Sequence, residues 1–204
     1  FPALRDFHPT YLLTNRLSFT KTVNNYSGEL ESYKNGDYTV EASSFEGAYY
    51  TNPENVFNGK VRADVNPPNR HYYSWTSLPI QNTTGNNPIH PINYIDDFGD
   101  SQVFTHSSVC QWLSLEIPFG IKVESWTCYY PDRAGRYWSL LGRDYTSGNV
   151  RILKNGTQDY SINNYQAYQQ QYITNVVNTN LYVDKLWFVF TGHRNVDDWI
   201  RIGS

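Results

Sequence analysis

Residues 111–143 read QWLSLEIPFGIKVESWTCYYPDRAGRYWSLLGR, and this stretch decides the fold class. Leu113, Leu115 and Ile117 recur at every second position with polar residues between them, which predicts a half-buried strand. We expect a turn at 118–120, followed by a second β-rich run, a polar loop with two arginines and a third apolar run. This succession of short apolar runs indicates an all-β protein.

The remainder of the chain continues the pattern of short strands and polar loops. Residues 60–110 are rich in Pro, Asn and Gly, which predicts a long loop with one short strand. We therefore expect an N-terminal arm or edge strand over 1–30, and one domain over 31–204 with a loop insertion at 60–110. The further strands are expected near 72–76, 137–142, 150–153, 172–177 and 186–191.

Composition limits the classes of partner. The 204 residues suit one β-sandwich, and aromatics make up 17% of them, with 18 Tyr against 10 Phe and 6 Trp. A formal net charge of −3 gives no electrostatic footprint for nucleic acid. No apolar run approaches the roughly 20 residues that a transmembrane helix requires. We expect neither nucleic-acid binding nor membrane insertion.

Several motifs follow one another in a fixed order along the chain. They are Ala42-Ser43-Ser44, Asn55-Val56-Phe57-Asn58-Gly59, Ser74-Trp75-Thr76-Ser77, Gln111-Trp112-Leu113, Trp138-Ser139-Leu140-Leu141-Gly142 and the C-terminal run LWFVFTGHRNVDDWIRIGS. In this order they resemble the galactose-binding-domain-like family, which includes discoidin domains, coagulation-factor C-type domains and many carbohydrate-binding modules. The resemblance covers residues 30–204 and implies a single antiparallel jelly-roll β-sandwich of about eight to ten strands. The expected core residues are Leu113, Leu115, Ile117, Trp126, Trp138, Leu140, Trp187 and Val189.

The segment Tyr33-Lys34-Asn35-Gly36-Asp37-Tyr38 precedes the Ala-Ser-Ser motif. In this feature the chain looks most like the variants of the family in large DNA viruses of algae and in phage fibre proteins. The resemblance implies a noncatalytic carbohydrate-binding or adhesion module on a virion, a fibre or another extracellular surface protein, with cell-surface or free glycans as partners. The alternative is a structural coat or filament subunit whose β-sandwich binds copies of itself or other coat and fibre subunits.

Members of the family usually bind sugar with loops at one end of the sandwich. A sugar ring requires a flat aromatic surface for its C–H face and planar or charged groups for its hydroxyls. Matched by position, the resemblance implies a glycan site formed by the central loop, the Trp-x-Ser element and the last loop. Its residues are His71, Trp75, Arg133, Arg136, His193, Arg194 and Asn195. Burial in the core is the alternative for Trp75 and Trp138, and surface ion pairing is the alternative for the arginines.

Many family members also hold a structural Ca²⁺. This chain has Asn58 where the family has an Asp, and it has Asp197 and Asp198 near its end. Ca²⁺ takes about six to eight oxygen ligands, and each carboxylate raises the affinity. The resemblance therefore implies a Ca²⁺ site at Asn58, Asp197 and Asp198 that is weakened by the loss of one charge.

Catalytic motifs are not apparent in the sequence. The five histidines show no HExxH or HxH spacing, and no serine lies in a Gly-x-Ser-x-Gly motif. Asp96-Asp97 and Asp197-Asp198 could be proposed as glycosidase carboxylates, but neighbours on one strand point to opposite faces and cannot flank one bond together. We expect solvated loop acids or cation ligands, and no enzyme. Cys110 and Cys128 lack zinc-site spacing, which leaves both a buried thiol and a disulfide open.

Overall fold

The computed structural model describes residues 20–23, 31–44, 52–57, 74–76, 91–104, 110–130, 137–157, 171–192 and 201–203. These residues form thirteen strands and one short 3-10 helix, so the all-β prediction is confirmed and the expected strand count was too low. The elements are β1 (Thr20–Val23), β2 (Glu31–Asn35), β3 (Tyr38–Ala42), η1 (Pro53–Val56), β4 (Ser74–Thr76), β5 (Ile92–Ile95), β6 (Ser101–Phe104), β7 (Gln111–Lys122), β8 (Ser125–Tyr130), β9 (Tyr137–Asp144), β10 (Val150–Thr157), β11 (Gln171–Val176), β12 (Tyr182–Gly192) and β13 (Arg201–Gly203).

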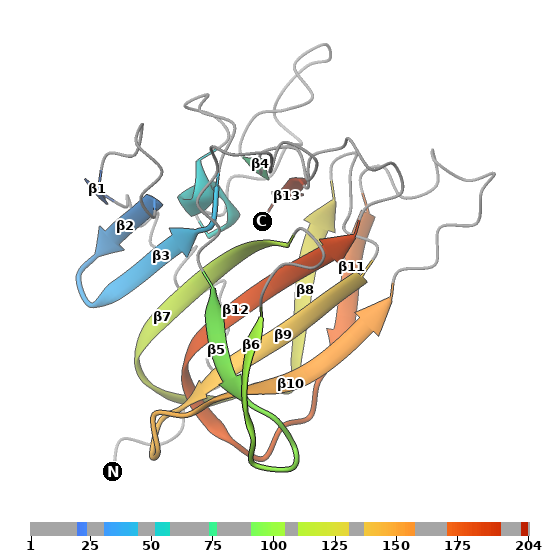
Figure 1. Cartoon of the computed structure of the whole chain (residues 1–204). Helices are drawn as coiled ribbons and strands as arrows, with labels where there is room; N and C mark the ends of the chain where they lie inside the picture. Colours follow the sequence, from blue (N-terminus) through green and yellow to red (C-terminus); the bar gives the residue numbers. More distant parts are fainter. Residues whose placement is uncertain are drawn as a thin grey trace, which may run out of the picture.

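The strands form two sheets that pack face to face (Figure 1). The larger sheet has nine strands in the order β1-β2-β3-β7-β12-β9-β10-β5-β6, and the smaller has four in the order β11-β8-β13-β4. All pairs are antiparallel except β5 with β10, which run parallel and meet at Ile95 and Arg151. One hydrophobic cluster contains residues of both sheets, so the chain is a β-sandwich as expected.

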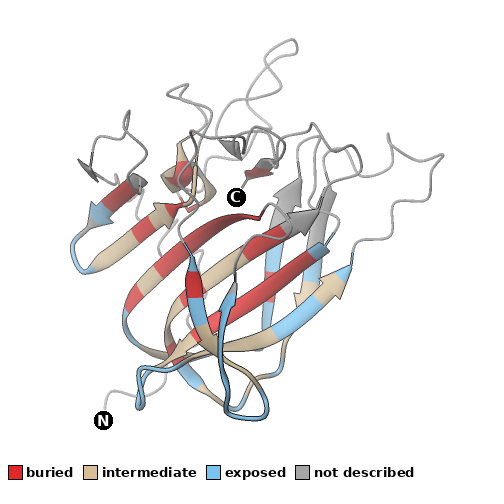
Figure 2. Ribbon diagram, viewed as in Figure 1, coloured by how far each residue is buried: buried red, intermediate tan, exposed pale blue. Residues whose placement is uncertain are grey.

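Alternation along β7 determines which residues enter the space between the sheets. Leu113, Leu115 and Ile117 are buried and belong to the inter-sheet cluster, as their spacing predicts. Trp112 and Ser114 therefore lie on the opposite side of the large sheet, which we call its outer face. Both are buried too, at 3% and 0% exposure, so residues 111–115 of β7 are buried on both faces of the sheet (Figure 2).

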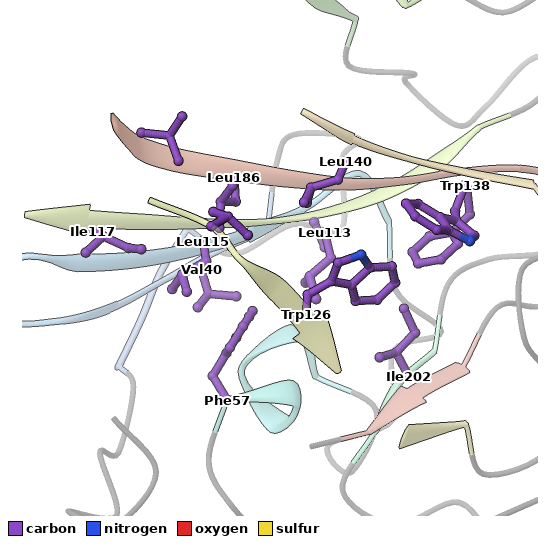
Figure 3. Packing of buried hydrophobic residues seen from close by; sticks show 14 of the residues in the cluster. Val40, Phe57, Leu113, Leu115, Ile117, Trp126, Trp138, Leu140, Leu186 and Ile202 are labelled. Atoms are coloured by element: carbon purple, nitrogen blue, oxygen red, sulfur yellow. The ribbon is translucent and has the colours of Figure 1, made fainter. Parts of the chain in front are cut away.

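Aromatic packing joins the two sheets in the core (Figure 3). Trp126 of the smaller sheet meets Trp138 of the larger sheet edge to face, with ring centroids 5.1 Å apart and planes at 82°. It also contacts Phe188, at 5.3 Å between centroids. Such pairs contribute about 0.5–1.5 kcal/mol each beyond the area they bury. The predicted core positions Trp126, Trp138 and Leu140 are confirmed.

A second hydrophobic cluster lies on the outer face. Its buried members are Ile92, Cys110, Trp112, Leu141 and Val189. Because Ile92 belongs to β5, the β5–β6 hairpin covers this face, and Figure 1 shows it crossing in front of β9 and β12. Burial raises the pKa of the Cys110 thiol to about 11.

The outer cluster corrects one sequence prediction. We expected Trp187 and Val189 in the main core, but Leu186 and Phe190 face it instead. Val189 is buried in the outer cluster, and Trp187 is only partly buried against it. The run from 186 to 190 is apolar at every position, so its alternation does not identify the inner side without the partner strands.

The prediction of a turn at 118–120 was also wrong. Strand β7 continues through Pro118 to its end, still opposite β12. The pairing register shifts here, since Glu116 lies opposite Lys185 whereas Ile121 lies opposite Val183. A proline has no N–H for a regular ladder, and this irregular stretch accommodates it without ending the strand.

The terminal and central segments contain further short strands. At the N-terminus, β1 pairs with β2 at one end of the large sheet. The region 60–110 contains β5 and β6 in addition to the one strand expected there. Both added strands are only four residues long, with Pro, Asn and Gly around them, so their sequence signal is weak.

Candidate functional site

The strands that lead into the two loops expected to contact sugar are paired with each other. The first, 131–136, joins β8 to β9, and the second follows the end of β12. Gly192, the last residue of β12, pairs with Tyr137, the first residue of β9. Strand pairing therefore brings the stems of both loops together at one end of the sheet, which we call the loop end (Figure 1, upper right). The loops themselves lie outside the described residues.

The smaller sheet brings a third predicted element close to the same strands. Gly203 of β13 pairs with Tyr129 near the end of β8, and Ile202 pairs with Trp75 of β4. The backbone of Trp75 is thus two strands away from the stem of the first loop. The other predicted ligand and metal residues lie outside the described residues. They are His71, Arg133, Arg136, His193, Arg194, Asn195, Asn58, Asp197 and Asp198.

A shallow, open depression of about 400 Å³ lies on β9 and β10 at this end. Because Trp138 and Leu140 face the core, their neighbours Tyr137 and Ser139 face outward. Across the ladder, Thr157 lies opposite Tyr137 and Asn155 lies opposite Ser139. These four side chains share the outer face, and they line the depression together with Trp138 and Gly156.

Behind the depression, on the core side of the sheet, close packing depends on a glycine. The indole of Trp138 packs so tightly against Gly156 that a Cβ on Gly156 would lie 2.1 Å from Trp138 Cζ2. Trp138 is only 6% exposed and is held by Trp126 on its other side, so the ring cannot move away easily. Trp138 is thus a core residue, the alternative considered from the sequence, and it makes this part of the sheet rigid.

The depression combines one aromatic ring with polar, uncharged groups. Tyr137 is 43% exposed, which leaves part of its ring open to solvent. The Ser139 hydroxyl donates to Asn155 Oδ1 at 2.7 Å. This bond orients the amide, so that its NH₂ group, a hydrogen-bond donor, points away from Ser139. None of the described lining residues carries a charge. The arrangement suits stacking and hydrogen bonding.

The Ala-Ser-Ser and Gln-Trp motifs, in contrast, hold β3 against β7. The Ser43 hydroxyl donates to Gln111 Oε1 at 2.8 Å and accepts from the Trp112 N–H at 2.9 Å. The Ser44 hydroxyl also donates to Gln111 Oε1. A backbone bond from Ser43 N to Trp112 O, 2.9 Å long, completes the contact. These motif residues therefore serve the fold, and sequence analysis alone does not reveal that they contact one another.

Five charged side chains form a network on the outer face, toward the end of the sheet away from the loops. Arg143 bonds both oxygens of Asp184, at 2.7 and 3.1 Å, and one oxygen of Glu116, at 2.7 Å. Lys185 lies 2.5 Å from Glu41 and 3.4 Å from Glu116. Three acids and two bases on adjacent strands satisfy one another, so the network stabilises the sheet and is not a ligand site.

Asp96, one of the candidate catalytic acids, has a structural role. Its Oδ1 accepts from the N–H groups of Phe98 and Asp100, both at 2.9 Å, and its Oδ2 accepts from Gln102 Nε2 at 3.0 Å. The backbone hydrogen bond with Asp100 is the main cause that lowers the pKa of Asp96. A carboxylate held in its ionised form closes the β5–β6 turn and is poorly suited to act as a general acid.

Within the described ranges, no group of three or more His, Cys, Asp or Glu residues is placed to hold a metal ion. The described residues also include no helix that is long and apolar enough to cross a membrane.

No known protein-family model matches the chain, and no curated protein matches it. Among solved structures, it is similar to the family 32 carbohydrate-binding module of C. perfringens NanJ in complex with galactose (12% identity, 81% of this chain and 89% of that chain, TM-score 0.49). It is also similar to chitosan-binding module 1 of a chitosanase/glucanase from Paenibacillus sp. IK-5 (11% identity, 81% and 90%, TM-score 0.49). A third is the family 32 module of AlyQ in complex with 4,5-unsaturated mannuronic acid (14% identity, 80% and 88%, TM-score 0.44). These similarities concern the β-sandwich fold, which the sheet topology of the chain establishes independently.

Proposed function

We propose that the chain is a noncatalytic carbohydrate-binding module whose ligand contacts lie at the loop end. The pairing of Gly192 with Tyr137 carries the proposal. It brings the stems of two loops next to each other, although these stems are 55 residues apart in the sequence (192 − 137 = 55). The sequence of these loops supports it, since one holds Arg133 and Arg136 and the other begins with His193. Arginine forks and imidazole groups are well suited to bind sugar hydroxyls and carboxylates.

The test is glycan binding by loop variants. Arg133→Ala and His193→Ala are expected to weaken binding to a glycan array or to a cell surface by about 1–3 kcal/mol each. Arg133→Lys is expected to weaken it as well, because an ammonium group does not reproduce a planar fork. Lys34→Ala is the control, since Lys34 is an exposed cation on β2, far along the sheet from the loop end. If the loop variants bind glycans as tightly as the wild type, the proposal fails.

The resemblance to the galactose-binding-domain-like family extends the proposal to location and metal. We infer that the chain acts on a virion, a fibre or another extracellular surface protein. We also infer that Asn58, Asp197 and Asp198 hold a structural Ca²⁺, for which Asn58 would supply an amide oxygen and the two acids would supply carboxylate oxygens.

Self-assembly as a coat or filament subunit is the second candidate. It is favoured by large side chains exposed away from the loop end, above all Phe98, which is 92% exposed at the turn between β5 and β6 (Figure 1, bottom). Sedimentation of the purified chain would distinguish the two candidates. An oligomer that Phe98→Ala converts to a monomer would favour assembly, and a glycan-binding monomer would favour the first proposal.

A further inference from the structure

We propose that the depression on β9 and β10 is a second sugar-contact region, so that the ligand is a glycan chain of two or more units lying along the outer face. This inference rests on the proposed function, because it takes the first sugar unit to be held by the loops. It adds Tyr137, Asn155 and Thr157 as ligand residues, none of which the sequence motifs indicated.

Continuity with the loops is the first argument. Tyr137 directly follows the 131–136 loop in the sequence and pairs with Gly192, where the second loop begins. Thr157 is opposite Tyr137. Asn155 lies two residues away on the same strand and faces the same side, since only Gly156 separates it from Thr157. A chain that emerges from the loops toward β10 therefore meets these side chains in succession.

The size and shape of the depression are the second argument. Its volume of about 400 Å³ falls within the range of roughly 300–1,000 Å³ that is usual for small-molecule sites. It is open and shallow, which suits a polymer that enters and leaves. An enclosed pocket would instead suit one terminal sugar.

The third argument is that its groups are held in place before a ligand arrives. The tight contact between Trp138 and Gly156 makes the strand pair rigid, and the hydrogen bond from Ser139 orients the Asn155 amide. Groups that are already ordered lose less conformational entropy on binding. An exposed ring beside an oriented amide and a hydroxyl satisfies both requirements of a sugar unit, a flat apolar surface and directional hydrogen bonds.

The chemistry of the lining also indicates which sugar unit fits. The described lining residues bear no cation that could pair with a carboxylate or a sulfate, so a charged sugar unit would gain no ion pair from them. We therefore expect the unit that contacts β9 and β10 to be a neutral sugar, such as a hexose or an N-acylated hexosamine.

The experiment measures how affinity depends on glycan length. A glycan array identifies the sugar that binds the wild type, and calorimetric titrations then compare its monosaccharide with its di-, tri- and tetrasaccharides. We expect the wild type to bind the longer forms more tightly. Tyr137→Ala should weaken binding of the longer forms by about twofold to tenfold, the contribution of one aromatic contact, and should leave monosaccharide binding unchanged. Tyr137→Phe should retain most of the gain, because stacking needs the ring.

Tyr145→Ala is the matched control. Tyr145 is also an exposed tyrosine, at 57%, but it lies in the turn that follows β9, at the opposite end of that strand. We expect this variant to bind glycans of every length as the wild type does. Asn155→Ala provides an independent test of the same region, with the loss again confined to the longer forms.

Three results would overturn the inference. One is a wild type whose affinity does not depend on glycan length. Another is a Tyr137→Ala variant that binds glycans of every length as tightly as the wild type. The third is a Tyr137→Ala variant that loses monosaccharide and oligosaccharide binding equally, because Tyr137 would then contact the first sugar unit. If the wild type binds no glycan at all, the proposed function itself fails.

Discussion

Replacing Arg143 with Met should measurably destabilise the sandwich. The guanidinium group of Arg143 connects β9 to Asp184 on β12 and to Glu116 on β7 through three hydrogen bonds of 2.7, 3.1 and 2.7 Å. Met retains most of the apolar stem but none of the donors. The substitution therefore removes the central cation of the network and leaves the carboxylate of Asp184, only 19% exposed, without these bonds.

The expected magnitude lies between two limits. Exposed ion pairs contribute about 0–1 kcal/mol, whereas removing one partner of a buried pair costs about 3–5 kcal/mol. Arg143 and Glu116 are about one third exposed, at 31% and 33%, so water screens part of the interaction. Lys185, 3.4 Å from Glu116, also remains as a partner for that acid. We expect a loss of about 2 kcal/mol, which for a chain of this size lowers Tm by about 4–8 °C.

Urea unfolding and thermal melts at neutral pH measure this loss. Arg143→Lys serves as the control, since it keeps the charge but cannot form the fork with Asp184, and it should fall between wild type and Arg143→Met. A change below about 0.5 kcal/mol for Arg143→Met would mean that the network adds little to stability, and it would refute the reasoning.

The same network predicts a dependence on pH. Burial alone raises the pKa of Glu116, but the hydrogen bond from Arg143 and the charge of Lys185 outweigh it, so the pKa lies below its usual range. A carboxyl group with a lowered folded-state pKa stabilises the fold fully above its unfolded pKa of about 4.3 and loses that contribution as pH falls through the folded value. As the pH falls below about 5, the free energy of unfolding of the wild type should therefore decrease more than that of Arg143→Met.

Three further predictions concern the core, the depression and the metal. Leu115→Asp should abolish folding, because it places an unpaired charge at a position 2% exposed; cooperative unfolding of a soluble variant would contradict the strand assignment. Gly156→Ala should cost about 1–3 kcal/mol and alter the near-UV circular dichroism, since the new Cβ would overlap the Trp138 indole at 2.1 Å; an unchanged spectrum and melt would contradict this packing. If Asn58 helps to hold Ca²⁺, chelator should lower Tm and Asn58→Asp should enlarge that shift, whereas identical melts with and without chelator would exclude the site.

Sequence patterns were most informative where one face of a strand is polar. Leu113, Leu115 and Ile117 alternate with polar residues, and all three are in the core. The pattern was least informative over 186–190, where both faces are apolar and both are covered. Likewise, the strong local preference of Pro118 predicts the start of a turn, but pairing with β12 on either side keeps the strand continuous.

By itself, the sequence determined the fold class and the core-facing residues of β7, because period-two alternation is a local property that any neighbouring strand must accommodate. Only the tertiary structure decided what lies beside the loops. The meeting of Gly192 with Tyr137, and the contact of Trp138 with Gly156, join residues 55 and 18 positions apart (192 − 137 = 55; 156 − 138 = 18). Such contacts depend on strand order and register, which follow from the packing of the whole sheet and leave no signature in a short segment.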